Sequence, residues 1–341
     1  MYFLVRMISQ ASYFAGPTGK HMHSTGIPVI TAEQTADILR HIDVREAMRR
    51  VFTSLAHGQA VQPAQKVVLL PDNRGDLINY FGVDMSRQRL GAKISPYLVT
   101  DQKPVITAWT LLMSTEDGMP LMLCDASLLT TERTAATTAL AVDLLAPEEA
   151  QILTVIGTGP VARAHLRHVL TLRNWKEIRV WSRSGTQSAE SVRSETGLPE
   201  GLLKVCGSTE EATKDTDVLM LCTSSATPVI DVKRLTRPCL ITSISTNAPG
   251  AHEVSPQALQ EMDVYCDYRQ TTPAHAGEMM IAARETGWAA EHIRGDLPEL
   301  VTGSAGRPLY KRHAFFRSLG LGLEDVAIAD SVLSYIRKQG N

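Results

Sequence analysis

The chain has 341 residues, of which 44% are hydrophobic and 21% charged, with a formal net charge of −2. These values suit a two-domain globular protein, and they exclude the strongly basic surface of a nucleic-acid-binding protein. The sequence has no run of about 18 apolar residues, so we expect neither a transmembrane helix nor a membrane partner. Five dispersed cysteines without a CxxC pair predict reduced thiols, no metal site and a cytoplasmic location.

Residues 1–26 are expected to form an N-terminal extension, because their apolar stretch is short and interrupted by polar residues. Thr31 and Asp43 are typical N-caps and predict two helices, the second closed by Gly58. From residue 66 to residue 125 the segments are short, β-branched or apolar, and separated by turns such as "DNRG" and "EDGMP". Consecutive strands with short connections predict a largely antiparallel or mixed sheet.

The pattern changes at a long helix rich in alanine and threonine, "LLTTERTAATTALAVDLLA". From Ile152 onward short apolar strands alternate with helices, and this order predicts βαβ units and a parallel sheet. A final helix begins near Leu323. We therefore predict an α/β protein with a Rossmann-type doubly wound parallel sheet in residues 127–312 and a mixed-sheet α+β domain in residues 27–126 and 313–341.

The segment "ILTVIGTGPVARAHL" joins an apolar strand to a helix through the motif G-x-G-x-x-A at residues 157–162. The first glycine permits a tight turn, the second lets the backbone approach a pyrophosphate, and the small third residue lets strand and helix pack closely. The helix N-terminus adds free N–H groups and a partial positive charge. We therefore predict a dinucleotide site at the segment Gly157, Thr158, Gly159, Pro160 and Val161.

The end of the next strand, "VWSRSGTQS", bears on the choice between NAD and NADP. An NAD site would carry an acidic residue here for the ribose 2′-hydroxyl, and none is present. Ser182, Arg183 and Ser184 favour a 2′-phosphate, so NADP is the preferred cofactor and NAD the alternative. The competing interpretation of Arg183 is an exposed arginine at the start of a helix.

A hydroxyl-rich segment, "LCTSSATPVI", follows the fourth strand of the parallel sheet. Thr223, Ser224 and Ser225 would lie at the carboxyl edge of that sheet, where doubly wound folds bind ligands. We expect these side chains to contact the ribose or the nicotinamide, with a simple turn as the alternative.

Four segments, in this order, resemble the ornithine cyclodeaminase/μ-crystallin family: "LLTTERTAATTALAVDLLA", "TVIGTGPVARAHL", "RVWSRS" and "FFRSLGLGLEDVAIA". The resemblance covers nearly the whole chain from about Ile27. The family contains cyclodeaminases, reductases of ketimines and cyclic imines, and amino-acid dehydrogenases. The resemblance therefore implies a small amino or imino acid as substrate, and a homodimer in which the first domain binds the substrate and forms the contact between subunits.

Two cationic residues match substrate-binding positions of the family. Arg133, in "TTERTAA", matches the arginine that binds the substrate α-carboxylate, and a guanidinium suits such a bidentate contact. Lys93, in "LGAKISPY", matches the lysine that faces the substrate, and burial would suit it to proton delivery. The alternatives are an ion pair of Arg133 with Glu132 or Asp125, and an edge-strand Lys93 in solvent.

Two positions depart from the family pattern. Many relatives carry an arginine after "QPx", where this chain has Gln65; the adjacent Lys66 is a candidate substitute for substrate binding, although strand alternation points it to the other face. In cyclodeaminases the loop matching "STNAPGAHEV" carries an aspartate that acts on the substrate amine, and here that residue is Asn247. An amide cannot act as a general base, so Asn247 argues against cyclodeamination. Asn247 is either a contact to substrate or nicotinamide, or a plain loop residue.

The segment "RSLGLGLEDVA" matches the part of the family that passes near the nicotinamide. Ser318, Leu319 and Gly320 are expected to approach it closely, with a turn at the helix start as the alternative for Gly320. His165 and His168, on the helix after the glycine turn, are interpreted as surface or packing residues, because no partner for a base and no set of metal ligands accompanies them.

Together these residues predict an NAD(P)H-dependent reductase of a small α-imino acid, such as the cyclic ketimines pyrroline-2-carboxylate and piperideine-2-carboxylate. Arg133 would fix the carboxylate, Lys93 would orient or protonate the imine, and the nicotinamide would deliver hydride to the carbon. Three alternatives stay open: an ornithine cyclodeaminase-type lyase with bound NAD, an amino-acid dehydrogenase or opine-like reductive condensation, and a non-catalytic NADPH-binding protein.

Overall fold

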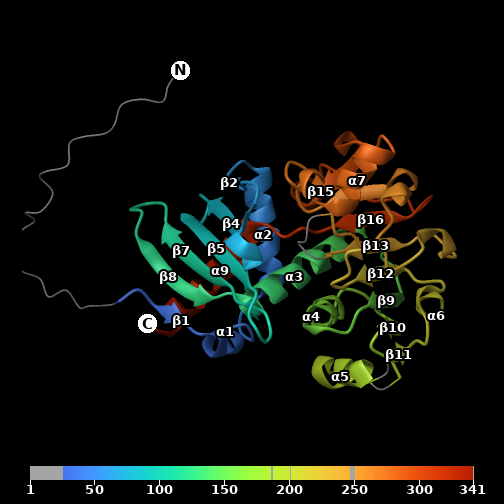
Figure 1. The fold of residues 1–341 in the computed structure, drawn as a ribbon, viewed down its shortest axis with the longest axis horizontal. Coiled ribbons are helices and arrows are strands. Elements are labelled where there is room, and N and C mark those ends of the chain that lie inside the picture. The colour runs from blue at the N-terminus through green and yellow to red at the C-terminus, as the bar shows by residue number, and fades with distance from the viewer. Residues whose placement is uncertain (1–25, 186, 200, 246–249, 341) are drawn as a thin grey trace, which may run out of the picture.

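A computed structural model describes residues 26–340, except 186, 200 and 246–249. Two β-sheets stand side by side, and the helix α3 (Ser127–Leu145) lies between them (Figure 1). This helix is buried along most of its length and packs against helices of both domains. Its alanine and threonine side chains are small, so neighbouring helices approach it closely, and the helix is held at a fixed position between the sheets.

The first sheet is antiparallel apart from one parallel pair, β1 with β8, which confirms the predicted mixed sheet. Its order is β1-β8-β7-β5-β4-β2, with β3 paired to β4 and β6 paired to β5. Short turns join most of its strands, so neighbours in sequence are neighbours in space. The strands are β1 (Val29–Ile30), β2 (Ala60–Val61), β3 (Lys66–Leu69), β4 (Gly75–Asp84), β5 (Arg89–Leu98), β6 (Val105–Ile106), β7 (Trp109–Ser114) and β8 (Pro120–Asp125).

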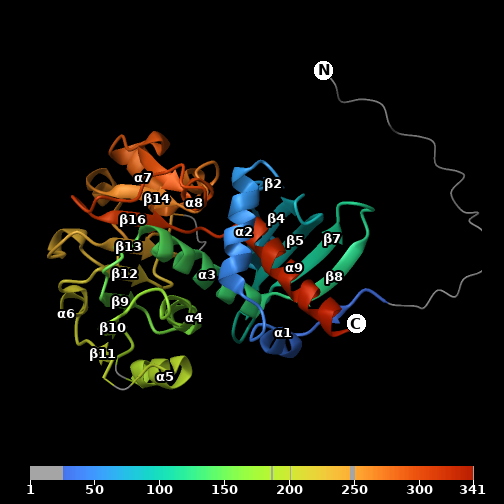
Figure 2. The ribbon, with the colours of Figure 1, turned by 180° about the vertical axis from the view of Figure 1, so that it is seen from behind.

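Helices cover one face of the first sheet. α1 (Ala32–Ile38) and α2 (Val44–Ala56) begin after the predicted caps, and α2 lies with α9 (Gly322–Gln339) over the sheet (Figure 2). α9 comes so close that an ideal Cβ on Gly82 would stand 2.5 Å from the Cα of Leu323. We call this covered side the inner face; among the described residues no helix lies over the opposite, outer face.

The second sheet is parallel in every described ladder, as predicted, and its order is β11-β10-β9-β12-β13-β16-β14-β15. The strand order reverses between β9 and β12, and doubly wound sheets bind ligands at such a reversal, at the carboxyl ends of the strands. The strands are β9 (Ile152–Ile156), β10 (Glu177–Trp181), β11 (Leu203–Val205), β12 (Val218–Leu221), β13 (Leu240–Ser243), β14 (Asp263–Cys266), β15 (Ile293–Asp296) and β16 (Ala314–Arg317).

The helices of the second domain connect these strands. Among the described residues no helix is both long and apolar enough to span a bilayer. The helices after α3 in this domain are α4 (Pro160–Val169), α5 (Gln187–Thr196), α6 (Thr209–Thr213), α7 (Gly277–Glu285) and α8 (Leu297–Val301).

The structure corrects the domain boundary near the C-terminus. The prediction placed residues 313–341 in the first domain, yet β16 pairs with β13 and β14 in the second sheet. Phe315 and Phe316 are both fully buried, because helices or loops cover both faces of this sheet, and so the strand lacks the alternating pattern of a half-buried strand. Only α9 returns to the first domain. The chain therefore crosses between the domains directly after Arg317.

Candidate active site

A cavity of about 760 Å³ opens between the two domains. One wall comes from the glycine turn and the ends of β10, β12 and β13, and the other comes from β4, β5 and α3. The cavity therefore brings together residues predicted for cofactor and for substrate. The predicted residues that line it are Lys93, Arg133, Gly157, Thr158, Gly159, Pro160, Val161, Ser182, Arg183, Ser184, Thr223, Ser224, Ser318 and Leu319.

The turn between β9 and α4 has a shape that only glycine permits. Gly157 adopts a φ of +120°, and an ideal Cβ there would overlap the carbonyl oxygen of Cys222. Gly159 is the N-cap of α4, and an ideal Cβ on it meets no atom within 4 Å. The first turn of α4 thus offers free backbone N–H groups beside open space, and these features fit the pyrophosphate of a dinucleotide.

A second hollow of about 330 Å³ adjoins the end of β10. Ser182 and Arg183 line both spaces, while Cys206 and Gly207 line the smaller one. Neither space has an aspartate or glutamate among its described lining residues. An acidic contact to a ribose 2′-hydroxyl is therefore missing from these residues, and Arg183, which lines both hollows, is exposed.

A buried carboxylate, Glu253, holds the ends of β12 and β13 together. Its Oε1 accepts hydrogen bonds from the backbone N and the hydroxyl of Thr223 at 2.8 and 2.6 Å. Its Oε2 accepts from the hydroxyl of Ser243 at 2.7 Å and the backbone N of Ser245 at 2.8 Å. The hydroxyl of Thr223 thus serves the fold. Ser225, predicted to contact the cofactor, is not among the residues that line the cavity, and its hydroxyl donates to the backbone carbonyl of Thr227 at 2.7 Å.

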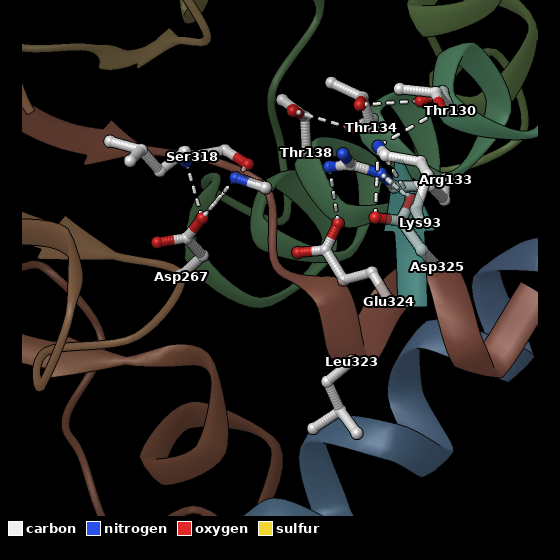
Figure 3. A network of polar contacts seen from close by, with 12 residues as sticks. Lys93, Thr130, Arg133, Thr134, Thr138, Asp267, Ser318, Leu323, Glu324 and Asp325 are labelled. Atoms are coloured by element: carbon white, nitrogen blue, oxygen red, sulfur yellow. Dashed lines mark hydrogen bonds and ion pairs between the residues drawn. The ribbon is translucent and has the colours of Figure 1, made fainter. Parts of the chain in front are cut away.

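Lys93 is buried at the cavity wall, so the alternative of an edge-strand lysine in solvent is wrong. Its Nζ lies 3.0 Å from Oδ2 of Asp325 and donates to the hydroxyl of Thr130 at 3.2 Å (Figure 3). The same atom stands 4.1 Å from the ring centroid of Tyr80. Burial lowers the pKa of Lys93 to about 8, against the opposing effect of Asp325. The ammonium is therefore mostly protonated at pH 7 and close to losing its proton.

Arg133 is fully buried and pairs with two acids at the start of α9. Its Nη1 donates to Oε2 of Glu324 and its Nε donates to Oδ1 of Asp325, both at 3.0 Å (Figure 3). The alternative pairing with Glu132 is wrong, because Glu132 contacts Arg167 and His168 instead. Asp325 therefore bridges the two cations of the site.

The loop after β16 shapes the site from behind Arg133. Oδ2 of the buried Asp267 accepts from the backbone N of Gly320 at 2.9 Å and from the backbone N of Leu319. Gly320 has a φ of +85°, and an ideal Cβ on it would overlap the guanidinium of Arg133. Ser318 and Leu319 line the cavity, whereas Gly320 does not. Gly320 was expected to approach the nicotinamide, but in the structure it packs against the guanidinium of Arg133 instead.

Two predicted site residues are not brought into the cavity. Lys66 is exposed, and its pairing with Asn79 places it on the outer face, because alternate residues of β4 share a face and Tyr80 points inward. The suggestion that Lys66 replaces the missing arginine is therefore wrong. The neighbouring Gln65 has a buried Oε1 without a hydrogen-bond partner. Asn247 lies outside the described residues.

The two histidines of α4 are not alike. His165 is buried, with Nδ1 2.7 Å from the carbonyl oxygen of Val161 and Nε2 3.0 Å from the hydroxyl of Thr138, and burial lowers its pKa to about 4. It is a packing residue, as predicted. His168 lies 2.8 Å from Oε2 of Glu132, so the expectation that no carboxylate accompanies it is wrong.

Sequence analysis missed several residues that line the cavity or hold it. Thr130 and Thr134 flank Arg133 at the spacing of one helix face, and Ser95 follows Lys93 at the spacing of one strand face, so periodicity alone was enough to find them. Glu324 and Asp325 stand in the motif "RSLGLGLEDVA", but nothing in the sequence indicates that they pair with Lys93 and Arg133. Residues without a usable sequence signal are Tyr80, Ile156, Trp181, Cys222, Val229, Ile244 and Ser245.

The fold and the cavity together define a two-domain protein with a Rossmann-type dinucleotide crevice that faces a buried pair of cations. The model of the ornithine cyclodeaminase/mu-crystallin family matches residues 29–340, and the chain belongs to this family. This confirms the resemblance drawn from the sequence.

Relatives in this family match most of the chain. An NAD(P)H-dependent anabolic L-arginine dehydrogenase of Pseudomonas aeruginosa is 56% identical over 311 residues, covering 91% of this chain and 98% of that protein. The ketimine reductase mu-crystallin of Rattus norvegicus is 26% identical and covers 89% of this chain and 95% of its own length.

Solved structures agree in fold. The Δ1-pyrroline-2-carboxylate reductase of Thermococcus litoralis, in complex with NADH and L-proline, superposes with a TM-score of 0.82 at 23% identity, covering 92% of this chain and 98% of that one. An archaeal alanine dehydrogenase dimer with bound NAD also gives 0.82, at 24% identity, covering 92% and 97%. These structures confirm the predicted fold class.

Proposed function

We propose that this chain is an NAD(P)H-dependent oxidoreductase that reduces the C=N bond of an α-imino acid to an amine. The relatives confirm the class of reaction, NAD(P)-dependent oxidoreduction of imino acids. The observation that carries the proposal is the meeting, in one cavity, of the glycine turn at residues 157–159 with the buried cations Lys93 and Arg133.

Each reacting group has a place in this cavity. Arg133 binds the substrate carboxylate, while Glu324 and Asp325 keep its guanidinium at the wall. When bound, the nicotinamide supplies a hydride to the imine carbon. The ammonium of Lys93 gives its proton to the nitrogen, so the electron pair of the C=N π bond ends in the new N–H bond. The lysine regains a proton from solvent before the next turnover.

The glycine turn and the end of β10 hold the dinucleotide in this proposal, and NADP is the preferred form. Gly157 and Gly159 let the backbone approach the pyrophosphate, and Arg183 contacts the 2′-phosphate. The absence of an acidic side chain among the described residues that line the two hollows supports this preference.

The proposed substrate is the open-chain imino acid of a basic amino acid of the L-arginine type. The 56% identical relative from Pseudomonas aeruginosa supports it. Beyond Lys93 the inner face of the first sheet runs on through Ser95 to Asp76, which is half-buried and lies opposite Tyr97. The backbone of Asp76 pairs with β3 and β5, and within the described residues its carboxylate makes no hydrogen bond or ion pair, so this carboxylate is available to a cationic side chain. A cyclic ketimine is the second candidate, supported by the mu-crystallin relative.

We further propose that the protein is a cytoplasmic homodimer. The outer face of the first sheet carries a row of exposed apolar side chains, and exposed apolar patches of this kind mark protein contacts. A dimer among the solved structures of the same fold supports this assembly. Phe81→Arg is expected to convert a dimer into a monomer in analytical ultracentrifugation, and a monomeric wild-type protein would contradict the proposal. The apolar row is Val61, Val68, Phe81, Ile94, Leu98, Val105, Trp109 and Leu111.

An oxidation assay with NADPH and NADH tests the activity. The oxo acid of L-arginine with ammonia, pyruvate with ammonia, and Δ1-pyrroline-2-carboxylate are offered in turn. We expect fastest NADPH oxidation with the arginine-type substrate. A preference for the cyclic imine would favour the second candidate. Ammonia release from ornithine without added cofactor would point to a cyclodeaminase, and cofactor binding without any turnover would point to a non-catalytic protein.

A further inference from the structure

The cavity wall behind the substrate site contains more acids than bases. Among the described residues, the acids Asp267, Glu324 and Asp325 are buried there with two cations, Lys93 and Arg133 (Figure 3). If all five groups were ionised, three negative and two positive charges would leave one negative charge among these buried side chains. A substrate carboxylate would add another. Buried unbalanced charge is costly, so one acid is expected to be neutral when the substrate is bound.

The three acids differ in how well their anions are supported. Asp325 bridges Lys93 and Arg133, and Asp267 accepts hydrogen bonds from the backbone N–H groups of Leu319 and Gly320. Glu324 receives one close hydrogen bond, from Nη1 of Arg133; its buried Oε1 has no partner within hydrogen-bond distance, and the nearby hydroxyl of Thr137 on α3 gives weaker support that lowers its pKa. A carboxylate with one bare oxygen in a buried site is the least stable of the three anions.

Several groups act on Glu324 from the elements around it. Burial raises its pKa to about 8, Arg133 on α3 opposes this rise, and Asp267 after β14 and Asp325 on α9 add to it. On the first sheet Lys93 stands behind Asp325, its partner. The first turn of α9 favours the anions of both Glu324 and Asp325, but only Asp325 touches both cations and is the better supported of the two.

An ionised Glu324 would also compete for Arg133. Its Oε2 accepts a hydrogen bond from Nη1 of Arg133. Nη1 is one of the two terminal nitrogens with which an arginine can bind a carboxylate in the bidentate mode. We propose that Glu324 is a positioning residue that leaves Arg133 free for the substrate carboxylate only as the neutral acid, so that carboxylate binding requires a proton on Glu324. This inference rests on the proposed role of Arg133 as the carboxylate site.

The sign of the effect follows from the acid's behaviour. Below pH 8 Glu324 is neutral and Arg133 is available; as the pH rises through about 8 the anion forms and the carboxylate ligand is lost. At pH 9 about nine-tenths of Glu324 is ionised, so ligand affinity falls about tenfold from this group alone. In Glu324→Gln the amide oxygen still accepts from Arg133, but no anion forms.

The test is the dissociation constant of a carboxylate ligand at pH 7 and pH 9, measured by calorimetry on the full chain saturated with NADP+. L-Arginine, L-alanine and L-proline serve as probes. Lys93 and the probe's own amino group also titrate in this range, but they do so in both proteins. We therefore expect the dissociation constant at pH 9, divided by that at pH 7, to be about tenfold smaller in Glu324→Gln than in wild type.

Equal ratios in wild type and Glu324→Gln would overturn the inference. It would also be overturned if Asp325→Asn lost as much of the pH dependence as Glu324→Gln does, since the proton could then not be assigned to Glu324. Infrared difference spectra of wild type at pH 9 give a second measurement that needs no variant. Ligand binding should produce the carbonyl band of a protonated carboxylic acid, and its absence contradicts the inference. Loss of NADPH oxidation with intact, pH-dependent ligand binding would refute the proposed activity alone.

Discussion

The two walls of the cavity are built in different ways. On the cofactor wall, Gly157, Gly159 and the start of α4 lie within a few residues of one another, and the backbone makes the site. On the substrate wall, Lys93 meets an acid 232 residues away and Arg133 meets the same acid 192 residues away. One wall is a local motif, whereas the other is an assembly of distant side chains.

The two walls should therefore be sensitive to different kinds of mutation. A backbone cradle tolerates most side-chain changes but fails when a Cβ is added, because the space and the φ angle leave no room. A buried ion-pair cluster fails when one partner is removed, because the others stay behind as uncompensated charges. Mutations on the two walls should therefore separate cofactor binding from substrate binding.

Arg133→Met should give the largest effect. We expect kcat/KM to fall about 1,000-fold, equivalent to about 4 kcal/mol, the usual cost of removing one partner of a buried pair. Stability should fall as well, because Glu324 and Asp325 lose their common partner. The NADPH dissociation constant, measured by fluorescence titration, should stay within twofold of wild type. A large change in NADPH affinity would mean that the two walls are not separable.

Gly157→Ala and Gly159→Ala form a matched pair on the cofactor wall. Both should weaken NADPH binding about 100-fold, since each places a methyl group in the cradle. Only Gly157→Ala should also lower the melting temperature, by about 5 °C or more, because its Cβ overlaps the Cys222 carbonyl oxygen in the protein itself. Equal melting temperatures of the two variants would contradict this geometry.

The pH dependence of kcat tests Lys93 as the proton donor. Burial lowers its pKa to about 8, so the ammonium is present below that pH and lost above it. With saturating substrate, kcat for imine reduction should fall about tenfold per pH unit above 8. Lys93→Arg keeps its charge over this range, so its kcat should be lower at pH 7 but flat up to pH 9. A wild-type kcat that is flat from pH 7 to pH 9 would remove Lys93 from this role.

Arg183→Asp should produce the smallest of these effects, a change of preference rather than a loss of function. We expect the ratio of kcat/KM for NADPH over NADH to fall about tenfold, because an exposed ion pair with the 2′-phosphate contributes about 1 kcal/mol and an acid there accepts from the 2′-hydroxyl instead. Steady-state assays with both cofactors measure the ratio. An unchanged ratio would show that Arg183 does not select the cofactor.

Local patterns predicted much of the fold. The caps at Thr31 and Asp43, the alternation of strands and helices after Ile152 and the glycine turn all depend on neighbours in sequence, and the structure contains them. The assignment of β16 was wrong because an apolar strand carries no mark of the sheet it joins. Lys66 failed as a site residue because the side chain follows the strand register, which pairing with β4 decides.

The sequence by itself determined the dinucleotide cradle, since a strand, a glycine turn and a helix start are contiguous and their backbone geometry follows from residue type. It also marked Lys93 and Arg133 as the cations of the site through their family motifs. Only the tertiary structure decided what holds those cations. Asp325 bridges them, Glu324 takes one nitrogen of Arg133, and Gly320 packs against its guanidinium, because folding returns α9 to the first sheet and buries charges that no local pattern connects.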